Sequence, residues 1–290
     1  MLPPGRLSFC MIVKNEEQHL RRCLDSVCGL AGEILVVDTG STDSTLQIAA
    51  EYGAAVLSFD FTRVDFAAAR NCALARACGS WILMLDADEA LDPAGAPAIA
   101  ELASGDRNAG YFLERRNHSE ASEKPFTDYV VRLFPNRPEY RYRGRVHETI
   151  DAAILGGGGK LIRTAIGIDH RFSADSEARR RKNRRYIEIL LEEIAEDPSD
   201  DSRLDFLAAE YHQLGNYAQA AEIAGKIARL RPWDARARLF CGVYHLLYQP
   251  DLKRARVELE AALKLRPGYT EAESFLRLLD ERERNSRWPP

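Results

Sequence analysis

Three acidic side chains follow a fully apolar segment in "WILMLDADEA", residues 81–90. Asp86 and Asp88 are two positions apart, so on an extended chain both carboxylates point the same way. Paired hard oxygen ligands suit Mg²⁺ or Mn²⁺, which proteins commonly hold through one or two carboxylates and substrate phosphates. A solvated turn would also explain the acids, but an acid cluster after an apolar strand is costly without a cation. We therefore predict a divalent metal site at Asp86 and Asp88.

A second polar group follows another apolar segment, in "VVDTGSTDST". Ser41 or Asp43 can cap the helix that starts there. This leaves the carboxylate of Asp38 to accept hydrogen bonds from a nucleobase N–H or a ribose hydroxyl. The first apolar segment ends similarly in "VKNEE", which offers Asn15 and Glu16 on the same rim. Because neither GxGxxG nor GxxxxGK[ST] occurs, a dinucleotide-fingerprint dehydrogenase and a P-loop NTPase are disfavoured.

The elements that position these acids alternate between strand and helix over the first 90 residues. Strands are expected at 7–13, 33–38, 54–59 and 81–86. Continuous apolar strands that alternate with helices predict an α/β fold with a parallel sheet covered on both faces. In such sheets, ligands bind beyond the carboxyl ends of the strands. The three polar groups therefore converge on one edge of the predicted sheet.

The pattern of expected elements changes twice after residue 90. Further strands are expected at 109–116, 128–135 and 160–170, and everything after about residue 176 has helical periodicity. A 35-residue repeat matches Ala220, Ile227 and "LRP" (230–232) with Ala255, Ala262 and "LRP" (265–267). This pattern resembles tetratricopeptide repeats, whose period is about 34 residues. We predict two domains, residues 1–175 and 176–290.

Bulk properties limit the class of protein. The chain has 290 residues, a net charge of −4 and a pI near 6.0, which disfavours a nucleic-acid partner. No segment reaches the roughly 20 apolar residues of a transmembrane helix, and the first residues do not resemble a signal peptide. Six cysteines without a CxxC pair favour reduced thiols and a cytoplasmic location. The basic run "RRRKNRR" (179–185) leaves a peripheral membrane contact open.

Four motifs together carry a family resemblance: "SFCMIVKNEE", "ILVVDTGSTDST", "DFAAARNCAL" and "GSWILMLDADEAL". In this order and spacing they resemble family 2 glycosyltransferases, which have the Rossmann-like GT-A fold for nucleotide-diphospho-sugars. With the tetratricopeptide-like helices, the chain is similar to a bacterial subgroup that includes peptide S-glycosyltransferases and cell-envelope sugar transferases. The resemblance implies a UDP-sugar donor and Mn²⁺ or Mg²⁺.

The resemblance also implies roles for residues around the nucleotide. Asp38 would bind the uracil or ribose close to Val13, with Asn15 and Glu16 on the same rim. Arg70, in "ARN", would approach the nucleotide or its pyrophosphate. The alternative for Arg70 is an exposed arginine on a helix surface.

The metal ligands follow from the same resemblance. Asp86 would serve both ribose and metal, and Asp88 would ligate the metal directly. Some GT-A enzymes use a histidine late in the domain as a third ligand, and His170 in "IGIDHRF" is the best-placed candidate here. The alternative for His170 is a structural histidine in the core or at a sheet edge.

An inverting enzyme also needs a general base close to its acceptor. The segment "GRVHETI" (144–150) places His147 beside Glu148. We predict that Glu148 is the base and that His147 positions it or contacts the donor phosphates, with exchanged roles as a second option. A purely structural His147 is the third option.

The predicted function is a metal-dependent, inverting transfer of sugar from a nucleotide-sugar to a peptide, protein or glycan acceptor. One alternative is a nucleotidyltransferase of similar fold, although "KNEEQHLRRC" stands where those enzymes carry a glycine-rich basic loop. Another is a non-catalytic helical-repeat adaptor, against which the clustered acids argue. The sequence leaves open whether the protein forms a homodimer.

Overall fold

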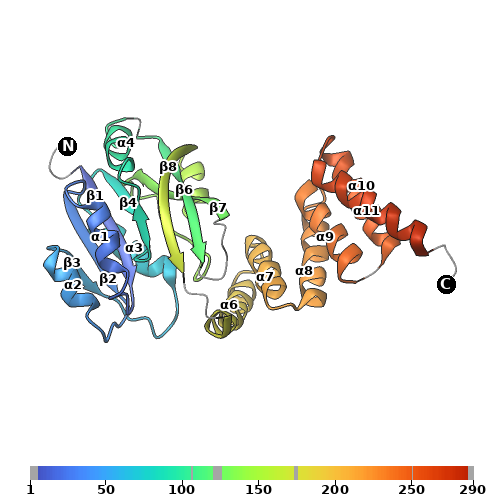
Figure 1. Ribbon diagram of the computed structural model, residues 1–290, viewed down its shortest axis with the longest axis horizontal. Helices are drawn as coiled ribbons and strands as arrows, with labels where there is room; N and C mark the ends of the chain where they lie inside the picture. Colours follow the sequence, from blue (N-terminus) through green and yellow to red (C-terminus); the bar gives the residue numbers. More distant parts are fainter. Residues whose placement is uncertain (1–5, 106, 120–125, 173–175, 250, 287–290) are drawn as a thin grey trace. The chain divides into compact units, whose positions relative to one another are not determined.

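The computed structural model describes residues 6–105, 107–119, 126–172, 176–249 and 251–286. The chain divides into two compact units, Met1–Asp175 and Ser176–Pro290. The first contains the strands and the second contains only helices (Figure 1).

The first unit is built on an eight-stranded sheet with the order β3-β2-β1-β4-β7-β6-β8-β5. Its strands are β1 Leu7–Val13, β2 Glu33–Asp38, β3 Ala55–Ser58, β4 Trp81–Met84, β5 Glu89–Leu91, β6 Ala109–Ser119, β7 Phe126–Pro135 and β8 Lys160–Phe172. The predicted α/β class is therefore confirmed.

Strands β1 to β4 form the parallel half of the sheet, as predicted. β1 lies between β2 and β4, and its last residue, Val13, is in register with Asp38 at the end of β2. The chain segments that leave β1, β2 and β4 therefore emerge at one edge of the sheet. The strands expected at 7–13 and 33–38 have the observed bounds, whereas β4 ends at Met84, two residues before its predicted end.

The other half of the sheet is mixed. β7 runs antiparallel to both β4 and β6, while β8 is parallel to β6 and antiparallel to β5. This register places His170 of β8 opposite Glu89 on one side and opposite Asn117 on the other. The sequence did not predict β5, because three residues are too few to show a periodicity.

Helices cover both faces of this sheet (Figure 1). They are α1 Leu20–Val27, α2 Thr45–Glu51, α3 Phe66–Arg76, α4 Gly95–Leu102 and α5 Asp151–Gly156. Strand residues alternate between two cores: Phe9 and Met11 pack with α1, α2 and α4, whereas Cys10 and Met84 pack with α3 and α5. Apolar residues on both faces explain why the strands read as continuous apolar runs.

The second unit consists of helices whose neighbours in sequence pack against each other. They are α6 Ser176–Glu196, α7 Ser202–Gln213, α8 Tyr217–Leu230, α9 Ala235–Leu247, α10 Leu252–Leu265 and α11 Thr270–Ser286. The repeat positions Ala220, Ile227, Ala255 and Ala262 are all buried, on α8 and α10. Small side chains at these positions let the helices approach closely, as the tetratricopeptide-like pattern predicts. Among the described residues, no helix has the length and apolar character needed to cross a membrane.

Gly79 sets how the chain enters β4, the strand that precedes the acids. A Cβ atom at this position would lie 2.6 Å from the backbone nitrogen and from Oγ of Ser8. Both atoms are fixed, because Ser8 is buried in β1 and its hydroxyl accepts a hydrogen bond from Gly79. We expect Gly79→Ala to lower the free energy of unfolding by about 1–3 kcal/mol, measured by urea denaturation. Gly156→Ala, which meets no atom within 4 Å, is the control and should change stability little. Equal stability of the two variants would contradict this packing.

Candidate active site

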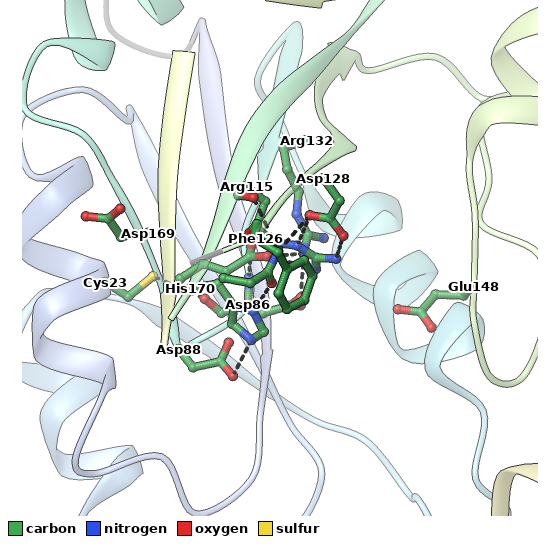
Figure 2. A network of polar contacts seen from close by, with 12 residues as sticks. Cys23, Asp86, Asp88, Arg115, Phe126, Asp128, Arg132, Glu148, Asp169 and His170 are labelled. Atoms are coloured by element: carbon green, nitrogen blue, oxygen red, sulfur yellow. Dashed lines mark hydrogen bonds and ion pairs between the residues drawn. The ribbon is translucent and has the colours of Figure 1, made fainter. Parts of the chain in front are cut away.

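Asp88 and His170 meet at the carboxyl edge of the sheet. Oδ2 of Asp88 lies 3.2 Å from Nε2 of His170, and both side chains are partly exposed. Figure 2 shows the two side chains pointing toward one another. The contact forms because β5 places Asp88 just before the residue that is in register with His170.

The amide of Asn117 decides which nitrogen of His170 carries the proton. Its Nδ2 donates to the carbonyl of Phe126 at 3.2 Å and to Oδ1 of Asp128 at 3.1 Å. Oδ1 of Asn117 is therefore the acceptor that faces Nδ1 of His170 at 2.7 Å, so that this nitrogen must be protonated. In the neutral imidazole, Nε2 then presents a lone pair to a carboxylate oxygen of Asp88. Two acceptors at this distance require a proton or a cation between them.

Asp86 faces a different way from Asp88. Its carboxylate forms ion pairs with Arg70, at 2.6 Å, and with Arg132. Burial works against ionisation, but Arg132 and Arg70 together hold the pKa of Asp86 well below its usual range. Asp86 is thus a charged member of an ion-pair network in the described structure.

Arg132 also holds the third acid of the cluster. Its guanidinium is 2.6 Å from Glu89, whose side chain is fully buried and also accepts a hydrogen bond from the backbone N–H of Asp86. Burial raises the pKa of Glu89, the charge of Asp86 raises it further, and Arg132 opposes both. Glu89 therefore fixes the turn between β4 and β5 and does not face a ligand.

Arg70 links the acid cluster to the predicted base. Its Nε donates to Glu148 at 2.7 Å while its Nη2 donates to Asp86. Arg70 is 5% exposed. The alternative prediction, an exposed arginine on a helix surface, is therefore wrong. Nη1 of Arg70 is buried and has no partner among the described residues. An unsatisfied donor here fits a role toward a ligand oxygen.

The segment that carries His147 and Glu148 is closed into a loop by its own backbone. Arg143 and Thr149 exchange hydrogen bonds of 2.9 and 3.1 Å between their main chains. Within this loop, His147 has a φ of 49°, a backbone conformation that costs free energy for a residue other than glycine. Such strain is common at functional sites. The loop aims Glu148 at Arg70, whereas His147 is half-buried beside it.

The predicted nucleotide rim lies beyond β1 and β2. The carboxylate of Asp38 accepts backbone hydrogen bonds from Gly40 and Ser41, which accounts for the turn after β2. Asn15, with a φ of 57°, accepts a hydrogen bond from the backbone of Thr42 and so ties the two loops together. Val13 is buried, and its carbonyl accepts from Thr39. Asp38 therefore has a structural role in this turn, and its contact with a nucleotide stays a prediction.

Glu16 belongs to the same rim. Burial raises its pKa, and the charges of Asp88 and Asp86 raise it further, whereas a hydrogen bond with His19 lowers it. These effects of Asp88 and Asp86 show that the ends of β1 and β4 lie close enough for their acids to interact.

The structure thus brings some of the predicted residues together and separates others. Asp88 and His170 form a pair, and Arg70 joins Asp86 to Glu148. The three predicted metal ligands do not form one group: among the described residues, no cluster of three or more His, Cys, Asp or Glu is arranged to hold a metal. The reason is that two arginines hold the carboxylate of Asp86.

Sequence analysis missed four residues of this site. They are Arg22, whose guanidinium donates to the carbonyl of Asp88 at 2.6 Å, and Arg115, Asn117 and Arg132 on β6 and β7. A weak signal existed: Arg115 and Asn117 are two positions apart, so they point to the same face of a strand. Nothing in the sequence indicated which residues of the neighbouring strands they would contact.

Comparison with known families identifies the first unit. The model of the family described as "Glycosyl transferase family 2" matches residues 8–167, which is more than half of the chain. The chain belongs to this family. The predicted family is therefore confirmed, and all residues of the polar network described above except His170 lie inside the family 2 region.

Curated relatives of this family 2 chain match it over part of their length. A TPR repeat-containing protein of Synechococcus elongatus is 43% identical over 52% of this chain and 37% of its own length. The SPbeta prophage-derived glycosyltransferase SunS of Bacillus subtilis is 25% identical over 74% of this chain and 51% of its own length. The lipopolysaccharide core biosynthesis glycosyltransferase LpsC of Rhizobium meliloti is 35% identical over 40% and 44%. The chain thus spans about half or less of the length of these relatives.

Among solved structures, S. aureus TarS resembles this family 2 chain in fold. The TM-score is 0.50 at 14% identity, covering 88% of this chain and 55% of TarS. This similarity concerns the fold alone.

The low pKa of Asp86 predicts an acid-sensitive stability. Below pH of about 4, the unfolded chain binds a proton at this aspartate while the folded protein does not. The free energy of unfolding therefore falls as the pH falls, by up to roughly 1.4 kcal/mol per pH unit for this group. We expect Asp86→Asn to flatten this slope in urea unfolding measured between about pH 3 and 6. The control Glu101→Gln, at an exposed position of α4, should keep the slope of the wild type. An unchanged slope in Asp86→Asn would refute the ion-pair network.

Proposed function

We propose that this chain transfers a sugar from a nucleotide-sugar, most simply a UDP-sugar, to a nucleophilic acceptor, with inversion at the anomeric carbon and with a divalent metal ion. The observation that carries the proposal is the contact between Asp88, which lies in the family 2 region, and His170, which follows that region by three residues, at the carboxyl edge of the sheet. The metal, the inversion and the acceptor are all parts of the proposal.

The residues at this edge fit a divalent cation. Two ligands in adjacent octahedral positions, each about 2.1 Å from the ion, lie roughly 3 Å apart. The separation of 3.2 Å between Asp88 Oδ2 and His170 Nε2 agrees with this value. The hydrogen bond from Nδ1 of His170 to Asn117 fixes the ring orientation in the way that metal-bound histidines usually require. Asp86 would join as a ligand, or bind the ribose, only by leaving one of its arginines.

The chain's own residues have separate tasks in this mechanism. Asp88 and His170 would hold the ion, which when bound draws negative charge from the leaving diphosphate. Asp38, Asn15, Glu16 and Val13 would form the nucleotide side of the site, and Arg70 would contact the nucleotide or its diphosphate. Carboxylate oxygens can accept more than one hydrogen bond, so the turn made by Asp38 leaves capacity for a nucleotide donor.

Glu148 would act as the general base. As the acceptor oxygen or sulfur forms its bond to the anomeric carbon, its proton moves to Glu148. The bond from that carbon to the phosphate oxygen breaks, and its electron pair leaves with the nucleoside diphosphate. Attack from the side opposite the leaving group inverts the configuration. Arg70 orients the carboxylate through Nε, and His147 positions it within the strained loop.

Two observations bear on the acceptor. Tetratricopeptide-like helices form surfaces that commonly bind peptides, which supports a peptide or protein acceptor. The name of the relative LpsC places that protein in lipopolysaccharide core biosynthesis, which supports a glycan acceptor. We propose both classes, and a nucleotidyltransferase or a non-catalytic adaptor is disfavoured by the family match over residues 8–167.

Metal-dependent nucleotide binding separates an enzyme from an adaptor. We expect UDP with Mn²⁺ at about 100 times its Kd to raise the Tm of the wild type by roughly 5 °C, and UDP alone to raise it less. Asp88→Asn should lose the Mn²⁺-dependent part, because the carboxylate is replaced by a weaker neutral ligand. The neighbouring Asp169→Asn is the matched control and should keep it. Loss of the Mn²⁺ effect in both variants, or in neither, would contradict the assignment of Asp88 as a metal ligand.

The role of Glu148 is testable by separating turnover from binding. We expect Glu148→Gln to lower kcat by roughly 10²- to 10⁴-fold, the usual contribution of a general base, while leaving the Kd for UDP within about threefold. Turnover would be followed as UDP release in the presence of acceptor. Glu139→Gln, a half-exposed glutamate between β7 and α5, is the control. Wild-type kcat in Glu148→Gln would exclude this residue as the base.

A further inference from the structure

The helical unit contains a polar pocket that the proposed reaction does not use. It has a volume of about 410 Å³ and is lined by α8, α9 and α10. The lining residues that matter here are Glu222, Gly225, Arg229, His245 and Arg254. All five belong to Ser176–Pro290, so the pocket is defined within a single compact unit.

Two arginines from different helices converge at this pocket. A Cβ atom on Gly225 would lie 3.5 Å from Nη1 of Arg229 and 3.7 Å from Nη2 of Arg254. The two guanidinium groups therefore cover the same point on α8, where glycine leaves room for them. In the part of the chain that the structure describes, neither side chain forms an ion pair with a carboxylate. Two like charges held together in this way repel each other unless an anion lies between them.

Two other arginines of this unit contrast with this arrangement. Arg231 is paired with Asp201 and Asp205, and Arg238 is paired with Glu258. Glu222 does line the pocket, but it precedes Arg229 by seven residues on α8. Among the described residues, it forms no ion pair with Arg229 or Arg254. Two arginines and one glutamate are the charged residues that line the pocket, so the lining carries a net positive charge.

His245 supplies a third polar group at the pocket, and one of its ring nitrogens is unsatisfied. The residue is 6% exposed, and its Nδ1 is buried with no hydrogen-bond partner among the described residues. A buried polar atom without a partner costs free energy. Burial, and then the charge of Arg254, lower the pKa of His245, so the ring is neutral near pH 7. A neutral ring can carry its proton on Nδ1 and donate it to an acceptor in the pocket.

We propose that this pocket is a binding site for an oxyanion of the phosphate class, held by Arg229, Arg254 and His245. Guanidinium groups match the oxygens of a phosphate in geometry and donate charge-assisted hydrogen bonds of about 2.8 Å. The pocket is larger than a phosphate group, so it also accommodates a phosphate carried by a small molecule. Binding here would stabilise the packing of α8 against α9 and α10, since the ligand touches all three.

The first test follows the Gly225 amide of the full-length chain by NMR during titration with inorganic phosphate, at constant ionic strength set with chloride. We expect a saturable shift of this amide in the wild type. The double variant Arg229→Gln/Arg254→Gln should lower the affinity for phosphate, as reported by this amide, at least tenfold. The control Lys226→Gln/Arg277→Gln removes the same charge at exposed positions outside the pocket and should bind as the wild type does.

Two results would overturn the proposal. One is an amide of Gly225 that does not respond to phosphate in the wild type. The other is a phosphate affinity that is equally reduced in the two double variants, which would indicate only a general effect of net charge. Because the proposed catalytic residues all lie in the other unit, neither result bears on the proposed sugar transfer.

A second variant supplies the anion covalently. Gly225→Glu places a carboxylate next to both guanidinium groups. We expect it to raise the Tm above that of the wild type in chloride and to remove the further gain that phosphate gives the wild type. A Tm gain from phosphate as large as in the wild type would contradict the assignment of the site. This test remains decisive if the arginine variants fold poorly.

Comparison of two ligands identifies the source of the phosphate. The same amide would be titrated with glycerol 3-phosphate at matched ionic strength. Affinity at least threefold higher than that for inorganic phosphate assigns the site to a phosphate carried by a larger molecule. Equal or weaker affinity assigns it to the free ion, and the absence of response to both ligands rejects the site.

Discussion

A single buried guanidinium, that of Arg132, holds the site together. It binds Asp86 and Glu89 at once, and these two residues lie at the two ends of the turn that joins β4 to β5. Removing one partner from such a buried group leaves an uncompensated charge, which typically costs 3–5 kcal/mol. The direction in which Asp88 points therefore depends on an arginine that comes from β7, nearly fifty residues later in the chain.

This constraint divides the acids of "DADEA" into two kinds. Asp86 and Glu89 balance arginines, while Asp88 faces His170. From the sequence, the carboxylates of Asp86 and Asp88 were expected to point the same way, because residues two apart on an extended chain share a face. That rule fails here because β4 ends at Met84 and the intervening residues form a turn. The family match was unaffected, since it rests on several motifs and not on the direction of one side chain.

The sequence predicted well what local patterns determine. Apolar runs located β1 and β2 to the residue, and a 35-residue repeat indicated the helices α8 and α10 that carry its matched positions. It did not predict contacts that depend on strand register. Arg115 meets Asp128, and Asn117 meets His170, only because β6 pairs with β7 on one side and β8 on the other. The antiparallel pairs and the three-residue β5 left no periodic signal by which this register could be found.

Arg70 is shared between the two halves of the proposed reaction. One nitrogen holds Asp86, on the side of the proposed metal and donor, and another holds Glu148, on the side of the acceptor. A ligand that draws Asp86 away from Arg70 therefore also changes the hydrogen bonding of Glu148. In the proposed reaction, an acceptor that weakens the contact between Glu148 and Arg70 would, by thermodynamic reciprocity, alter donor affinity by the same factor. The two substrates of the proposed reaction would thus be energetically coupled through one side chain.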